Sequence, residues 1–443
     1  MQIFITLSII LGLTALFAYV NARVLHLQET IGLMALALGF TILLMLLDAF
    51  GLPDPLTRDL AFVDRLSLDD VLLNGLLCFL LFSGSINVPT RTLGEEKWVV
   101  LTLALGATLL GAVLVGVAIW GLLDVAGLAA ALGLGTGIGL MFALAFGALI
   151  SPTDPIAALA ILGKMGLPPR LEAIINGESL FNDGVGVVVF TICVTIAGGL
   201  AQPTAMDALG LFLREVCGGV LLGLMVAAAL HHMLMLTPDY GNQVLISLAA
   251  VTVGYAVAHE VEVSGPIAMV VTGLIVGNVT LPRLSQELRT DFETFWQGID
   301  EVLNALLFVL IGLHVALVPG DPGLLPLATV AVVVCLLARW LSVSASLTAL
   351  AGVGGLRGDV LGLTNLLTWG GLRGGLAVAM ALSLPNVAQK NLILHMTYGV
   401  AAFSIIVQGL TIQRLFTTDS LRRLLAPDGA GKRGMADAGE ARP

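Results

Sequence analysis

The feature that most constrains this chain is a series of long apolar segments. A membrane-spanning helix needs about 20 mostly apolar residues. Segments of about that length are 3–20, 31–47, 68–87, 99–123, 138–163, 171–199, 208–235, 243–259, 264–281, 296–317, 325–349, 361–385 and 392–416. Because 58% of the residues are hydrophobic and 11% are charged, a soluble fold would lack polar surface to face water. We therefore predict an all-α polytopic membrane protein with these 13 segments as transmembrane helices.

Lysine and arginine are distributed unevenly between the loops. With the N-terminus outside, 14 of the 20 basic residues fall in inside segments and 3 fall in outside segments. This excess is typical of cytoplasmic loops, so we predict a multi-pass protein of the cell membrane with an outside N-terminus and a cytoplasmic C-terminus. The basic residues form no stripe, which argues against a nucleic-acid partner.

Residues 1–418 are predicted to form the transmembrane domain, and its longest outer loop, 48–70, is acidic. We interpret this loop as a solvated segment. Residues 419–443 are polar, and the segment is rich in Gly, Ala and Arg. This composition predicts a short, disordered cytoplasmic tail.

Two of the predicted spans are interrupted near their middle. The fifth contains Ser-Pro-Thr-Asp-Pro at 151–155, and the twelfth contains Trp-Gly-Gly-Leu-Arg-Gly-Gly at 369–375. The prolines remove backbone donors and break the helix, and Asp154 is well placed to cap a second half-helix. Interrupted spans at corresponding places in two halves are typical of transporters with inverted repeats. We therefore predict two inverted six-helix repeats in which the broken helices 5 and 12 cross.

The sixth span carries polar groups in an otherwise apolar run. Ser179 and Asp183 share one helix face, and Glu178 and Asn182 share another. Ionisable residues inside a span are costly and mark functional sites. Because Glu178 and Asp183 lie about 140° apart around the helix, we expect them to have different functions.

Arg373 is expected to be the basic residue buried at comparable depth. A guanidinium there needs a carboxylate partner, which is either Glu178 or Asp183. If Glu178 is the partner, Asp183 remains as the exchangeable carboxylate. Burial favours its neutral form, so a proton can compete with a cation for the same oxygens. Oxygen ligands suit Na⁺ or Li⁺ better than a transition metal.

Several motifs resemble those of a known family. The strongest are Gly-Glu-Ser-Leu-Phe-Asn-Asp-Gly at 177–184, the Pro-containing break at 151–155 and the Gly-rich segment at 369–374. Further similar segments are Leu80–Ile86, Val263–Pro266, Gly277-Asn278 and Phe295–Gly312. Together they resemble bacterial (NhaP-like) sodium/proton antiporters of the monovalent cation:proton antiporter-1 family, relatives of the eukaryotic sodium/proton exchangers. The resemblance covers nearly the whole membrane part, in order.

The resemblance implies a secondary active antiporter that serves pH and sodium homeostasis, not an enzyme. It implies a homodimer in the lipid bilayer that works by elevator-like alternating access. The dimerisation part is expected at about 1–95 and 208–317, and the ion-transporting core at about 99–200 and 325–416. No cofactor is implied, because Na⁺ (or Li⁺) and H⁺ are the transported ions.

The resemblance also assigns roles to individual residues. Asp183 would hold the cation or the proton in turn, and an Asn rather than a second Asp at 182 goes with electroneutral 1:1 exchange. The implied sodium ligands are Asp183, Glu178, Ser179 and Thr153. The implied supporting residues are Asn182, Asp154 and Arg373, with Arg373 paired to Glu178.

Alternative functions remain at this point. A K⁺/H⁺ antiporter of the same fold is the main one, since these ligands hardly separate Na⁺ from K⁺. A cation channel is disfavoured by the two mid-membrane breaks. An intramembrane aspartyl protease could use Asp154 and Asp183, but the sequence has no Gly-x-Gly-Asp run and gives Arg373 no role in that chemistry.

Overall fold

The computed structural model describes residues 2–49, 75–132, 137–198, 205–314, 325–356 and 358–418, together with residues 421 and 424. Every regular element in these ranges is helical, which confirms the predicted all-α fold. Most of the predicted outer loop 48–70 and of the predicted tail 419–443 lies outside the described residues.

The helices follow one another along the chain with short connections. The first half contains α1 (Gln2–Val20), α2 (Glu29–Ala49), α4 (Leu77–Ile86), α5 (Thr90–Glu95), α6 (Lys97–Leu101), α7 (Thr108–Trp120), α8 (Leu128–Ala131), α9 (Leu140–Ile150), α10 (Pro155–Lys164) and α11 (Pro169–Ala197). The second half contains α12 (Ala205–Leu236), α13 (Tyr240–Glu260), α14 (Gly265–Ile275), α15 (Gln286–His314), α16 (Leu325–Gly352), α17 (Val360–Gly370), α18 (Gly375–Leu382), α19 (Ala388–Phe403) and α20 (Gly409–Leu415).

Within the described residues, 9 helices are long and apolar enough to cross a membrane. Each predicted segment contains a helix, but α2 and α4 carry shorter apolar stretches, and two predicted spans are divided into the pairs α9/α10 and α17/α18. Helix length therefore does not fix the number of crossings. The count of thirteen and the orientation of the termini stay predictions.

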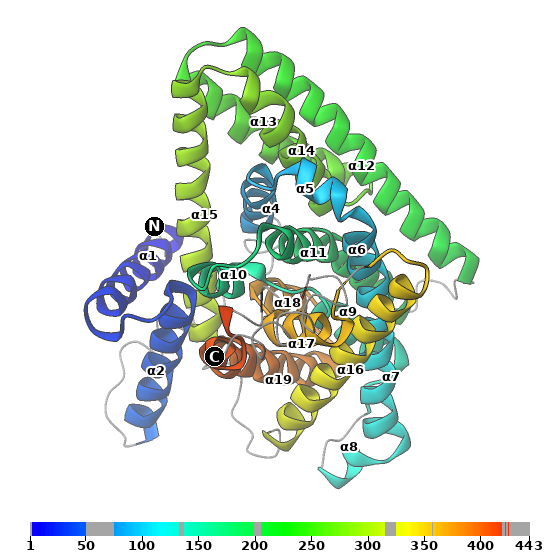
Figure 1. Cartoon of the computed structure of the whole chain (residues 1–443). Helices are drawn as coiled ribbons and strands as arrows, with labels where there is room; N and C mark the ends of the chain where they lie inside the picture. Colours follow the sequence, from blue (N-terminus) through cyan, green and yellow to red (C-terminus); the bar gives the residue numbers. More distant parts are fainter. Residues whose placement is uncertain are drawn as a thin grey trace, which may run out of the picture.

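The helices pack into groups that are far apart in the sequence but close in space (Figure 1). One large apolar core joins α7, α9, α10 and α11 to α16–α20. A separate core joins α4 to α12–α15, and a third small core lies between α1, α2 and α15. In Figure 1, α12–α14 lie on one side of the molecule and α16–α19 on the other, with α4 and α11 between them.

Close contact between α7 and α9 holds the first broken helix in place. A Cβ atom added at Gly147 would lie 2.1 Å from the carbonyl oxygen of Ala112, and one added at Gly116 would lie 2.7 Å from the Cα of Leu144. Small residues allow the backbones of membrane helices to approach this closely. The end of α9, and the break that follows it, are therefore positioned by backbone contact.

Candidate ion-binding site

The two interrupted helices meet in the interior. Residues 151–154 separate α9 from α10, and residues 371–374 separate α17 from α18. The backbone N–H of Asp154 donates to the carbonyl of Leu372 at 2.7 Å, which joins the two breaks directly. The Asp154 carboxylate accepts from the N–H of Ile156 at 2.9 Å and caps α10. Both predicted breaks and the predicted cap are present.

Glu178 is held by a dense set of donors. Nη2 of Arg339, from α16, donates to both carboxylate oxygens at 2.9 Å, and the two side chains are 4% and 2% exposed. Asn182 Nδ2 donates to Oε1 of Glu178 at 2.7 Å, and the Thr153 hydroxyl reaches the same oxygen at 3.4 Å. A buried ion pair needs such additional hydrogen bonds to offset the desolvation of both charges.

The predicted pairing of Arg373 with Glu178 is wrong. Nη1 of Arg373 donates instead to the carbonyl oxygens of Ser151 and Pro152, at 2.5 and 2.9 Å. The break after α9 leaves these carbonyls without helical partners, so they satisfy the guanidinium. Arg373 therefore stabilises the crossing itself, and Arg339 supplies the counter-charge to Glu178.

Arg339 was missed because a second buried basic residue was not considered. It lies in the middle of the apolar run 325–349. An arginine at that position is itself a sign of a functional partner, by the reasoning applied to Arg373. The sequence contains that signal but does not say which arginine reaches Glu178.

Asn182 links α11 to the first break. Its amide nitrogen donates to the Thr153 hydroxyl at 2.9 Å as well as to Glu178, and its amide oxygen accepts from the Thr153 N–H at 3.4 Å. The Thr153 hydroxyl also lies 3.2 Å from that of Ser179. The structure thus brings together Thr153, Glu178, Ser179 and Asn182 as one polar cluster.

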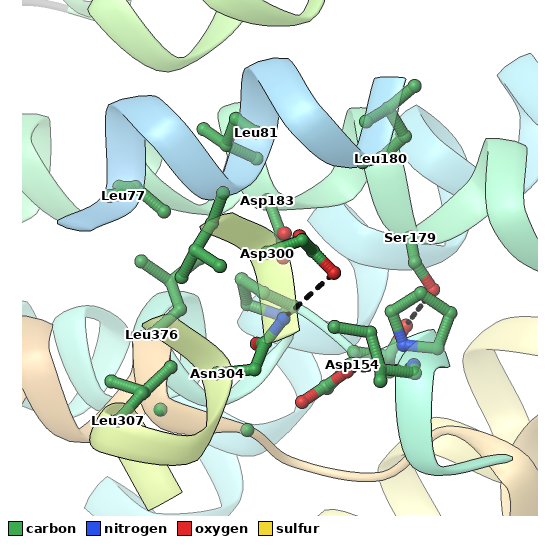
Figure 2. Close-up of a pocket in the computed structure, with 18 of the residues that line it drawn as sticks. Leu77, Leu81, Asp154, Ser179, Leu180, Asp183, Asp300, Asn304, Leu307 and Leu376 are labelled. Atoms are coloured by element: carbon green, nitrogen blue, oxygen red, sulfur yellow. Dashed lines mark hydrogen bonds between the residues drawn. The ribbon is translucent and has the colours of Figure 1, made fainter. Parts of the chain in front are cut away.

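Asp183 differs from Glu178 in its surroundings. It is half-buried, and its carboxylate makes no hydrogen bond or ion pair with any residue that the structure describes. It lines a cavity of about 160 Å³ together with Thr153, Asp154 and Ser179. Figure 2 shows Asp183, Ser179 and Asp154 around this space. A carboxylate with unused oxygens beside a cavity can take up a cation or a proton.

The opposite wall of the cavity is also polar, which the sequence analysis did not foresee. Asp300 and Asn304 on α15 line it, across from the broken helix (Figure 2). The Asp300 carboxylate accepts from the hydroxyl of Ser83 at 2.8 Å and from Asn304 Nδ2 at 3.1 Å. All three residues lie in segments that carry the family resemblance, but a sequence does not show that two such segments face one cavity.

Comparison with known proteins agrees with this geometry. The family model described as the transmembrane sodium/hydrogen exchanger matches residues 12–418. This chain belongs to the sodium/hydrogen exchanger family. It is 39% identical over 404 residues to the Na⁺/H⁺ antiporter NhaP of Pseudomonas aeruginosa, covering 91% of this chain and 93% of that one. It is 33% identical to the Na⁺/H⁺ antiporter NhaH of Halobacillus dabanensis, over 76% of this chain and 80% of that one.

The fold of this exchanger matches that of a solved antiporter. MjNhaP1, the sodium proton antiporter of Methanocaldococcus jannaschii solved at pH 8, superposes with a TM-score of 0.65. The match covers 90% of this chain and 99% of that one at 19% identity. Family membership confirms the predicted class of secondary transporter. The channel and protease alternatives are set aside, because the exchangers of this family are transporters rather than enzymes.

Proposed function

We propose that this exchanger trades Na⁺ (or Li⁺) for H⁺ across the cell membrane, with both ions using Asp183 in turn. The observation that carries the proposal is the contrast between two neighbouring carboxylates. Glu178 is engaged by Arg339, Asn182 and Thr153, whereas Asp183 faces the cavity with its oxygens free. The names of the relatives, which are Na⁺/H⁺ antiporters, support this pair of ions.

The proposed sodium ligands are oxygen atoms around the cavity. Asp183 supplies a carboxylate, and Ser179 and Thr153 supply hydroxyls. Carbonyl groups at the break and one oxygen of Glu178 can complete the shell. Hard oxygen ligands of this kind suit a small monovalent cation, and an unpaired carboxylate away from bulk water favours uptake of a proton when no cation is bound.

The exchange is proposed to be electroneutral. Residue 182 is an asparagine whose amide nitrogen is already used by Thr153 and Glu178, so it adds no titratable group to the site. With Asp183 as the exchangeable carboxylate, one Na⁺ moves for one H⁺. No net charge then crosses the membrane, and the membrane potential does no work on the cycle.

Alternating access is proposed to arise from movement of one helix group against the other. The broken helices belong to the large core built on α7, α9–α11 and α16–α20, whereas Asp300 belongs to the separate core built on α4 and α12–α15. The cavity lies between these two groups. We propose that the first group carries the ion, and that the second, with α1 and α2, forms the homodimer interface.

Reconstitution into vesicles tests the proposed function. A pH gradient is imposed with the potential clamped, and Na⁺, Li⁺ and K⁺ are added separately. Proton movement on addition of Na⁺ or Li⁺ is the expected result. Exchange with K⁺ alone would assign the K⁺/H⁺ function, and cation flux without proton movement would reject antiport.

Asp300 offers a test of the cavity as the ion path. Because its charge lies on the wall opposite Asp183, Asp300→Asn should raise the half-saturating Na⁺ concentration by about 2- to 5-fold, with the maximal rate retained. Asp291→Asn, an exposed position on the same helix, is the matched control and should change neither. An unaltered Na⁺ dependence in the Asp300 variant would place the path elsewhere.

A further inference from the structure

A second, much smaller cavity lies behind the crossing. Its polar lining comes from Arg339, Thr368, Arg373 and Gln408, and the rest is apolar. It has about 10 Å³ of space open to the centre of a water molecule. None of the residues around it also lines the ion cavity, so it is a separate site.

Two buried polar atoms converge on this cavity. Nε of Arg339 and Oγ1 of Thr368 have no hydrogen-bond partner among the described residues. The two residues are only 4% and 7% exposed, so neither atom can reach bulk water. A buried polar atom that is left unpaired costs about 1–3 kcal/mol. Two such atoms beside one cavity indicate a shared ligand.

We propose that one buried water molecule occupies this cavity, accepts a hydrogen bond from Arg339 Nε and joins it to Thr368 Oγ1. Size decides between the candidate ligands. About 10–15 Å³ measured in this way holds one water molecule, which needs two to four polar partners. A halide ion would also suit two guanidinium groups, but it is larger than water and exceeds the space available.

The water completes a chain of contacts from the end of α17 to the ion site. Thr368 lies in the last turn of α17, the water joins it to Arg339 on α16, and Arg339 holds both oxygens of Glu178. Gln408 Nε2 donates to the carbonyls of Thr368 and Trp369, which fixes the same turn from the other side. Thr368 is therefore a positioning residue that acts on Glu178 through the water and Arg339.

Removal of the Thr368 hydroxyl gives opposite results with and without the water. Thr368→Val keeps the shape of the side chain but takes away a partner of the water, so the melting temperature should fall by about 2–4 °C. Thr368→Ser, which keeps the hydroxyl, should restore most of the loss. If the hydroxyl instead has no partner, its removal leaves the melting temperature unchanged or raises it, and the proposal fails.

The control variant is Thr364→Val, one turn earlier in α17. Thr364 is buried as well, but its hydroxyl is satisfied within the helix by the carbonyl of Val360 at 2.7 Å. The fall for Thr368→Val should exceed the fall for Thr364→Val. These measurements use the full chain and do not depend on transport, so they can fail while the proposed function stands.

A structure at a resolution that shows ordered water gives the direct test. Crystals of the full chain are grown with sodium bromide in place of chloride. We expect one density peak within hydrogen-bond distance of Arg339 Nε and Thr368 Oγ1, without an anomalous bromide signal. The absence of a peak, or a bromide peak at that position, would overturn the assignment.

Discussion

Replacing Asp183 with asparagine is expected to abolish Na⁺-dependent proton movement while the protein stays folded. The substitution keeps the size of the side chain but removes the negative charge and the group that takes up the proton. Because Asp183 makes no hydrogen bond or ion pair within the described part of the chain, its loss should leave the polar cluster around Glu178 intact. We expect exchange below about 1% of wild type, an effect on the order of 3 kcal/mol or more.

The control for this experiment is Asp239→Asn. Asp239 is exposed and caps α13 through the N–H of Asn242 at 2.9 Å, and asparagine caps a helix equally well. Exchange in reconstituted vesicles should be unchanged there, and both variants should elute and melt like wild type. Robust Na⁺-dependent pH recovery in the Asp183 variant would reject the mechanism.

The second large effect is expected from the buried pair of Glu178 and Arg339. Removing one member leaves the other charge buried without a partner, which costs about 3–5 kcal/mol. Glu178→Gln and Arg339→Met should therefore each destabilise the protein strongly. The double variant should lose less than the sum of the two, with a coupling of about 2 kcal/mol or more in an unfolding cycle.

A parallel cycle with Arg373→Met separates the two possible pairings. Arg373 donates to the carbonyls of Ser151 and Pro152, so its loss should be closer to additive with Glu178→Gln. If the Arg373 cycle shows the larger coupling instead, the pairing of Glu178 with Arg339 is not the one that stabilises the protein.

The backbone of the site could be predicted from the sequence because local chemistry decides it. Prolines 152 and 155 break the first helix wherever the rest of the chain lies, and Asp154 caps the next turn. The Gly-rich segment at 371–374 interrupts the second helix for a related reason, since glycine is a poor helix former. These features depend on neighbours in the sequence, and the structure has them all.

Side-chain partners could not be predicted in the same way. Arg339 lies 161 positions from Glu178, and only the packing of α16 against the rest of the core decides that it, rather than Arg373, reaches the carboxylate. The meeting of Ser83 with Asp300 likewise depends on the contact between α4 and α15. Charge balance showed that a partner was needed, but three-dimensional packing chose it.

The division of roles between the two carboxylates also depends on this packing. The helical spacing predicted that Glu178 and Asp183 face different directions, and the structure gives each direction its content. Glu178 faces Arg339, and Asp183 faces the cavity. The proposal that Asp183 is the exchangeable group rests on this difference rather than on charge alone.

Competition between Na⁺ and H⁺ tests the central proposal most directly. Initial exchange rates are measured in vesicles over a range of Na⁺ concentrations at several pH values, with the potential clamped. If both ions use Asp183, the half-saturating Na⁺ concentration should rise as pH falls, by up to about tenfold per pH unit, while saturating Na⁺ restores the rate. A half-saturating concentration that does not change with pH would contradict a shared site.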